Sequence, residues 1–184
     1  MSAETTCMND ASPQSNPDLV PAPAGSQWVV LHARPRCEKK LAQACRQQGL
    51  ACYLPVLCKT HTYGSRVRTF EVPLFSGYLF GVADRQQCLL LEQNRMLANI
   101  LLAVDQDCLV RQLVQVDLAL QSGEAIDVLP YLEEGSLVKI SSGPFRGMEG
   151  VIERIKGKSR VILNVDMIGQ AIAMEVDSTY LSPS

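Results

Sequence analysis

The residues best suited to catalysis are few in this chain. It has two histidines, His32 and His61, and seven cysteines. Neither histidine has a serine or cysteine partner in a recognisable motif, and GxGxxG, GxxxxGK[ST] and HExxH sequences do not occur. We therefore expect no enzyme activity, no catalytic residues and no cofactor. A cysteine nucleophile served by one of the histidines is the remaining catalytic alternative.

The nearest approach to a metal site is formed by Cys52, Cys58 and His61. The Cys58-x-x-His61 spacing suits a ligand pair, but a structural zinc site usually draws four ligands from two such pairs, and the second pair is missing. We therefore expect no metal. The number of cysteines is odd and no CxxC occurs, which favours reduced thiols that pack as small hydrophobic residues over a disulfide framework.

Basic residues gather in the first part of the chain. The whole chain has 17 Lys and Arg against 19 Asp and Glu, a formal net charge of -2. Residues 27–82 hold eight basic and two acidic residues, whereas residues 123–184 hold six basic and nine acidic ones. Lysine and arginine bind nucleic acids by neutralising phosphates. The distribution fits either nucleic-acid contact by the first part or an ordinary solvated helix face.

The basic residues lie in a part of the chain whose pattern predicts both strands and helices. In residues 27–121, apolar residues recur at both strand and helical spacing. The pattern predicts strands at 28–33, 50–57, 73–82 and 98–104, a hairpin over 59–72 around Gly64-Ser65, and helices from Pro35 to Gly49, at 84–93 and at 108–121. We expect an antiparallel sheet with helices on one face.

The flanking segments differ in composition. Residues 1–26 are rich in Pro and Ser, without basic residues, and predict a disordered tail. Residues 122–134 carry Gly123, Pro130 and several acidic residues, which is typical of a linker. Residues 135–184 contain four short Val/Ile-rich runs separated by Gly-containing turns, which predict a small β-barrel.

The overall composition favours a soluble protein. Apolar residues make up 47% of the chain, enough for a core, yet no uninterrupted apolar run approaches the roughly 18 residues that span a bilayer. The N-terminus lacks the basic and apolar regions of a secretory signal. We expect a cytoplasmic protein with no membrane partner.

Two groups of motifs carry a resemblance to a known family. Residues 134–152, EGSLVKISSGPFRGMEGVI, closely resemble a KOW motif. WVVLHARPRCEKK at 28–40, GLACYLP at 49–55 and VPLFSGYLF at 72–80 resemble the N-terminal NGN domain of the NusG family of transcription elongation factors. The resemblance covers about residues 27–182 and implies an α+β fold: an NGN domain at 27–121 joined by the 122–134 linker to a KOW β-barrel at 135–184.

The resemblance implies a polymerase-binding surface around the aromatic motif. In the family this apolar surface docks on the clamp helices of the largest catalytic subunit of RNA polymerase. The matching residues are Phe75, Tyr78, Phe80 and Leu74. Strand alternation sends Tyr78 and Phe80 to one face and Leu79 to the other. The alternative is that these aromatic residues are core residues of the sheet.

Two further surfaces follow from the resemblance. Phosphates of the non-template DNA strand would meet the basic residues Arg34, Arg36, Lys39, Lys40, Arg66 and Arg68. Ribosomal protein S10 would meet the KOW residues Phe145, Met167, Ile168 and Gln170. Generalist members carry an aromatic residue followed by Gly-Arg at the 166–170 loop, and the missing arginine here argues against Rho as a partner.

The resemblance implies a non-enzymatic, monomeric factor for elongation and antitermination. ARPRCEKK and PLFSGYLF are more similar to specialised RfaH-like paralogs than to the housekeeping factor. The β-branched runs after residue 135 favour a stable barrel without a switch to a helical hairpin. Two alternatives remain: a generalist factor that supports Rho-dependent termination, and an RNA- or ribosome-binding KOW protein.

Overall fold

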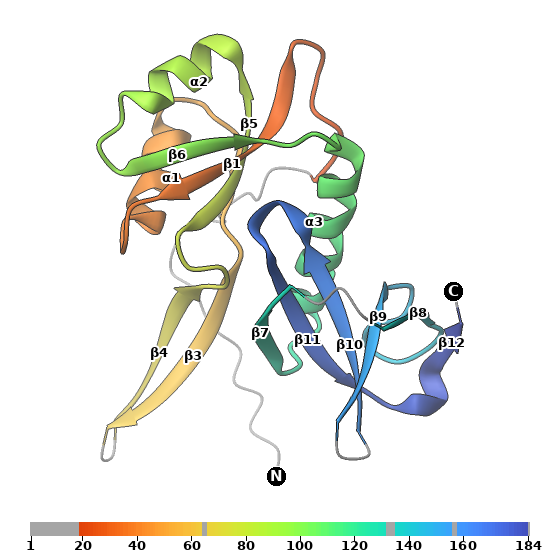
Figure 1. Cartoon of the computed structure of the whole chain (residues 1–184). Coiled ribbons are helices and arrows are strands. Elements are labelled where there is room, and N and C mark those ends of the chain that lie inside the picture. Colours follow the sequence, from red (N-terminus) through yellow and green to blue (C-terminus); the bar gives the residue numbers. More distant parts are fainter. Residues whose placement is uncertain (1–18, 64–65, 132–134, 156–157, 184) are drawn as a thin grey trace.

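The structure, a computed structural model, describes residues 19–63, 66–131, 135–155 and 158–183. In Figure 1 a first sheet with its helices lies above a second sheet, and a long hairpin extends beside the second sheet. Among the described residues, no helix is both long and apolar enough to cross a bilayer. The α+β class expected from the sequence is confirmed.

The N-terminal part contains a four-stranded sheet, three helices and a two-stranded hairpin. The sheet and hairpin strands are β1 (Ser26–Ala33), β2 (Cys52–Tyr53), β3 (Val56–Tyr63), β4 (Arg66–Pro73), β5 (Tyr78–Asp84) and β6 (Leu97–Leu102). The helices are α1 (Glu38–Gln47), α2 (Arg85–Glu92) and α3 (Gln106–Gln121). The sheet has the order β2-β5-β1-β6 with antiparallel pairing, and within the described part of the chain β3 pairs only with β4.

Helices cover both faces of this sheet, which corrects the expectation of one covered face. Val29 and Leu79 pack in a cluster with Leu41 of α1 and Leu91 of α2. Trp28, Val30 and Phe80 belong to a cluster with residues of α3, including Leu109, Leu113 and Val116. Successive residues of a strand point to opposite faces, so the wholly apolar stretches of β1 and β5 supply a core on each side.

The start of α1 and the start of β5 differ from the sequence prediction. The helix begins at Glu38 and not at Pro35, because Arg36 has a left-handed backbone with φ 62° that no helix accommodates. The strand begins at Tyr78 and not at residue 73, because residues 74–77 form a turn that Gly77 closes with φ 84°. The hairpin is confirmed, with Tyr63 paired to Arg66 across residues 64–65, which lie outside the described residues.

The C-terminal part is one six-stranded antiparallel sheet in the order β12-β8-β9-β10-β11-β7. Its strands are β7 (Ile126–Pro130), β8 (Ser136–Ile140), β9 (Glu149–Ile155), β10 (Lys158–Val165), β11 (Gln170–Val176) and β12 (Leu181–Pro183), with short 3-10 turns η1 (Asp166–Ile168) and η2 (Ser178–Tyr180). The four strands expected for the barrel are all present.

Two segments expected to be irregular are partly structured. Residues 126–130 of the predicted linker form β7, which pairs with β11 because Ile126 turns its apolar side chain to the core opposite Met174. Leu19 and Ala22 of the predicted tail pack against the core, and the Trp28 indole N–H donates to the Val20 carbonyl at 2.8 Å. Residues 1–18 and 132–134 lie outside the described residues.

Candidate functional site

The aromatic motif lies mainly inside the N-terminal sheet. Phe75 and Phe80 are fully buried and Leu74 is 4% exposed. The two phenyl rings meet edge to face, with centroids 6.4 Å apart and planes at 85°. As expected from alternation, Phe80 packs on the α3 face and Leu79 on the opposite face. Phe75, Phe80 and Leu74, which the family resemblance assigns to polymerase binding, thus have little or no exposed surface in this structure.

Tyr78 is the member of the motif that keeps exposed surface. It is half-buried, and its ring stacks on the imidazole of His32 with centroids 4.9 Å apart and planes at 17°. His32 and Tyr78 are direct partners in the β1–β5 ladder, where cross-strand side chains lie close together. The sequence prediction did not place His32 at this site. The register of the β1–β5 pairing brings it there, and the local sequence pattern does not contain that register.

The stacked pair is held by the turn that precedes β5. A Cβ atom at Gly77 would lie 3.5 Å from the His32 ring, and the Gly77 carbonyl accepts from the Ala33 N–H at 2.8 Å. The Gly77 N–H in turn donates to Glu38 Oε1 at 2.9 Å. Glu38 is only 9% exposed, so this carboxylate serves the turn rather than the solvent. The first residue of α1 thereby fixes the turn beside Tyr78.

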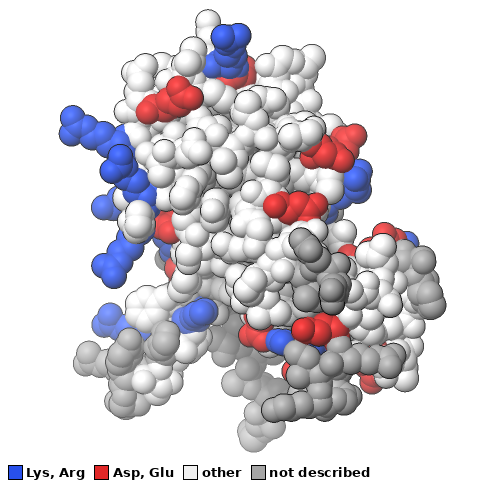
Figure 2. Space-filling view, viewed as in Figure 1, with Lys and Arg blue, Asp and Glu red and all other residues white. Residues whose placement is uncertain are grey.

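The predicted basic residues surround the start of α1 and extend to the hairpin. Arg34, Arg36, Lys39 and Lys40 are exposed around the β1–α1 connection, and Arg68 is exposed on β4. Figure 2 shows Lys and Arg along one edge of the molecule, over the side where Figure 1 draws α1 and the hairpin. Lys39 Nζ lies 3.5 Å from Glu71 Oε2 of β4, which links the two elements. The side chain of Arg66 lies outside the described residues.

The predicted KOW residues do not share one environment. Phe145 is 3% exposed and belongs to the core, as expected for a residue that caps the sheet. Met167 and Ile168 are half-buried in η1 and pack against that core. Gln170 is half-buried at the start of β11. The 166–170 loop therefore keeps surface for a partner, but Phe145 does not.

That loop also contacts the N-terminal part through α3. Gln112 Nε2 donates to Asp166 Oδ2 at 2.7 Å, and the Asp166 N–H donates to Gln112 Oε1 at 3.2 Å. The Glu149 N–H donates to Gln115 Oε1 at 3.2 Å. A cavity of about 220 Å³ lies between this helix and the C-terminal sheet. Besides these hydrogen bonds, the buried residues of α3 belong to one hydrophobic cluster with residues of both sheets, so the helix packs against each of them.

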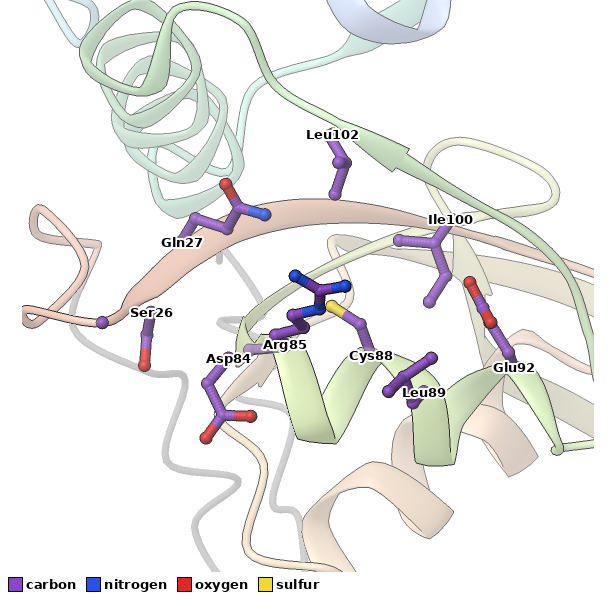
Figure 3. A pocket seen from close by; sticks show the side chains of 11 residues that line it. Ser26, Gln27, Asp84, Arg85, Cys88, Leu89, Glu92, Ile100 and Leu102 are labelled. Carbon is purple, nitrogen blue, oxygen red and sulfur yellow. The ribbon is translucent and has the colours of Figure 1, made fainter.

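A second cavity of about 610 Å³ lies between α2 and the end of the first sheet. Figure 3 shows Arg85 and Cys88 on α2 facing Gln27 and Ile100 on the neighbouring strands. Burial raises the pKa of the Cys88 thiol, and the carboxylates of Glu92 and Asp84 raise it further. A protonated thiol is a poor nucleophile.

Comparison with known proteins adds two family matches. A family model described as "Transcription termination factor nusG" matches residues 26–122, and one described as "KOW motif" matches residues 134–164. A curated relative, "Transcription elongation factor Spt5" of Sulfolobus acidocaldarius, is 47% identical over 38 residues, which span 20% of this chain and 25% of that protein. The matched stretch is thus about a quarter of the relative's length.

Two solved structures are similar over most of the chain. One is titled "Domain interaction in Thermotoga maritima NusG", with 18% identity, a TM-score of 0.49, and coverage of 86% of this chain and 97% of the other. The second is an MjSpt4:Spt5 complex, with 16% identity, a TM-score of 0.28, and coverage of 85% and 96%. At these TM-scores the two family matches, and not the superpositions, identify the fold.

Proposed function

This chain belongs to the NusG family, and from that premise we propose that it is an elongation factor that binds RNA polymerase through its N-terminal domain. The observation that carries the proposal is the succession of the two matches, over 26–122 and 134–164, in one chain. The same order and spacing of domains argues against a ribosomal protein with a KOW motif alone.

The stacked pair of Tyr78 and His32 is the part of the aromatic motif best suited to dock on the polymerase. Partly exposed aromatic rings held rigidly by their neighbours are typical centres of protein interfaces. Buried Phe75 and Phe80 lie beneath as support. We place the clamp helices of the largest catalytic subunit on this surface, as the family resemblance implies.

The basic residues around the start of α1 would then meet the non-template DNA strand. Arg34, Arg36, Lys39 and Lys40 lie close in sequence to His32 and are all exposed. A positive surface beside a protein-docking site attracts a phosphate backbone without reading its sequence. This arrangement supports a factor that stabilises the transcribing complex and suppresses pausing.

The C-terminal sheet would connect this complex to a second partner. Met167, Ile168 and Gln170 keep partly exposed, mostly apolar surface, which suits ribosomal protein S10. The loop lacks the arginine expected for Rho, so we favour a specialised antitermination factor over a generalist. Stimulation of Rho-dependent termination by the purified protein would favour the generalist instead, and co-sedimentation with ribosomes but not with polymerase would favour an RNA-binding role.

The decisive experiment is binding of the full chain to core RNA polymerase. Tyr78→Ala should weaken binding about tenfold or more, as removal of a central interface aromatic does. Tyr180→Ala is the matched control, because Tyr180 is a 38% exposed tyrosine on the C-terminal part. Equal affinities for the wild type and Tyr78→Ala, with circular dichroism showing both folded, would contradict this docking surface. Absence of wild-type binding would contradict the proposed function itself.

A further inference from the structure

One carboxylate is buried in the described part of the chain. Glu38, the first residue of α1, is 9% exposed, and the other buried polar side chain among the described residues, Ser159, is uncharged. A charged side chain is rarely buried unless a partner compensates for the water it has lost. The partner here is a backbone group 39 positions later in the chain, because Glu38 Oε1 accepts from the Gly77 N–H at 2.9 Å. The buried charge therefore serves the turn that precedes β5.

Gly77 is held from two elements at once. Its N–H is bonded to α1 through Glu38, and its carbonyl accepts from the Ala33 N–H of β1 at 2.8 Å. The residue has a φ of 84°, a conformation that residues other than glycine rarely adopt. The Tyr78 N–H closes the turn by donating to the Phe75 carbonyl at 3.2 Å. Hydrogen bonds to one residue thus link the turn to both α1 and β1.

The residues next to these hydrogen bonds carry the stacked rings. Tyr78 follows Gly77 and His32 precedes Ala33, and the two ring centroids lie 4.9 Å apart. Without Glu38 the Gly77 N–H would have to turn to water for a partner, because an unpaired backbone N–H is costly. Such a movement of the turn would carry Tyr78 away from His32. A surface that is ordered before binding binds more tightly, since the complex does not bear the cost of ordering it.

We propose that Glu38 is a positioning residue for the docking surface: through the Gly77 N–H, its carboxylate keeps the rings of Tyr78 and His32 in the arrangement that the polymerase binds. The proposal rests on the function proposed above. A different role for Glu38 is stabilisation of α1, because an acidic residue in the first turn of a helix interacts favourably with the helix dipole. That role requires negative charge at position 38, whereas positioning requires an oxygen atom that reaches Gly77.

Three substitutions at position 38 separate these two roles when binding of the full chain to core RNA polymerase is measured. Glu38→Gln keeps an acceptor oxygen on a side chain of the same length and should retain the affinity within about threefold. Glu38→Asp keeps the charge but is one methylene shorter, and Glu38→Ala has no acceptor. Both should bind about tenfold more weakly than the wild type. Weak binding by the Gln variant with full binding by the Asp variant would overturn the proposal in favour of helix stabilisation.

The positioning role further predicts that Glu38 acts through Tyr78. In the Tyr78→Ala background, Glu38→Ala should weaken binding about twofold or less, because the ring that it positions is gone. Hydrogen exchange of the free chain measures the same link without the polymerase, and the Gly77 amide should exchange about tenfold faster in Glu38→Ala than in the wild type. Losses that add fully in the double variant, or an unchanged exchange rate of Gly77, would overturn the proposal.

Glu92→Ala is the matched control, because Glu92 is an exposed glutamate at the end of α2 in the same part of the chain, and both measurements should keep their wild-type values. Glu38→Asp decides the question if circular dichroism shows that Glu38→Ala does not fold. Wild-type affinity in the Ala and Asp variants would overturn this proposal and leave the proposed function intact. Absence of polymerase binding by the wild type would contradict the proposed function, and this proposal with it.

Discussion

At the scale of single residues, Tyr53 shows how a buried polar group joins two elements. Its side chain is 1% exposed, and its hydroxyl donates to Asp117 Oδ1 of α3 at 2.9 Å. Burial raises the pKa of Tyr53 above its ordinary value of 10.0, and the charge of Asp117 and their hydrogen bond raise it further. The short edge strand β2 is thereby attached to the long helix.

Tyr53→Phe should lower the free energy of unfolding by about 1 kcal/mol near neutral pH, because it removes this hydrogen bond and keeps the ring. The raised pKa means that folded Tyr53 keeps its proton at a pH where the unfolded chain has lost it. Its contribution is thus complete below pH 10 and falls as the pH rises further. Denaturant unfolding at a series of pH values should show the two proteins converging above pH 10; a constant difference would contradict this account.

The sequence predicts only part of the arrangement of the docking site. Alternation correctly separates Phe80 from Leu79, because adjacent strand residues must point to opposite faces. Alternation does not show that α3 covers the Phe80 face. That helix follows more than twenty residues later, and its packing on the sheet is a tertiary contact. Placing Tyr78 beside His32 requires the register of the β1–β5 pairing, which no local pattern contains.

At the scale of elements, β9 depends on a glycine for its approach to β10. A Cβ atom at Gly150 would lie 2.5 Å from the Ile162 carbonyl oxygen and 2.8 Å from Val161 Cγ1. The backbone atom cannot move without disturbing the ladder that joins the two strands. Position 150 therefore requires a glycine, because any side chain there would overlap β10.

Gly150→Ala should destabilise the C-terminal sheet by roughly 1–3 kcal/mol, the usual effect of overpacking. Hydrogen exchange of β9 and β10 amides in the full chain measures it, as a loss of protection confined to this sheet. Leu137→Ala on the neighbouring β8 is the control; this side chain is 64% exposed, so the change should be within about 0.5 kcal/mol. Unchanged protection in Gly150→Ala would contradict the prediction, because it would mean that the strands accommodate the added methyl group without loss of stability.

Element existence was easier to predict than element limits. The strands at 28–33 and 98–104 and the helix at 108–121 have regular apolar patterns, and each is present within a few residues. The prediction for the start of α1 was wrong, because the preference of proline for the first helical position does not reveal the left-handed backbone of Arg36. β7 was missed because its pairing with β11 depends on residues forty or more positions away.

At the scale of the whole molecule, α3 is shared by the two sheets. Val116 and Leu113 are buried with the first sheet, while Gln112 and Gln115 bond to the second. The contact with the second sheet is also apolar, because buried residues of α3 share one hydrophobic cluster with Val161, Leu163 and Met174 of the C-terminal part. The two parts are therefore joined by hydrophobic packing as well as by these hydrogen bonds.

Alkylation of Cys108 in the native protein can test this contact. Burial raises the pKa of Cys108, and the carboxylates of Asp166 across the contact and of Asp105 raise it further. Asp166→Asn should therefore lower that pKa and speed the reaction of Cys108 with iodoacetamide at mildly alkaline pH. Cys88, whose neighbours are Glu92 and Asp84, should react at an unchanged rate. Equal Cys108 rates in both proteins would mean that the two parts are separated in solution.

The position of Trp28 gives the molecule a built-in optical reporter. This is the one tryptophan of the chain, it is fully buried in the first sheet, and its indole N–H is bonded to the Val20 carbonyl. Ultraviolet emission from the indole will shift to longer wavelength when water reaches the cluster around the ring, which includes residues of both sheets. A melt followed by emission that coincides with a melt followed by circular dichroism would show that the two halves unfold together.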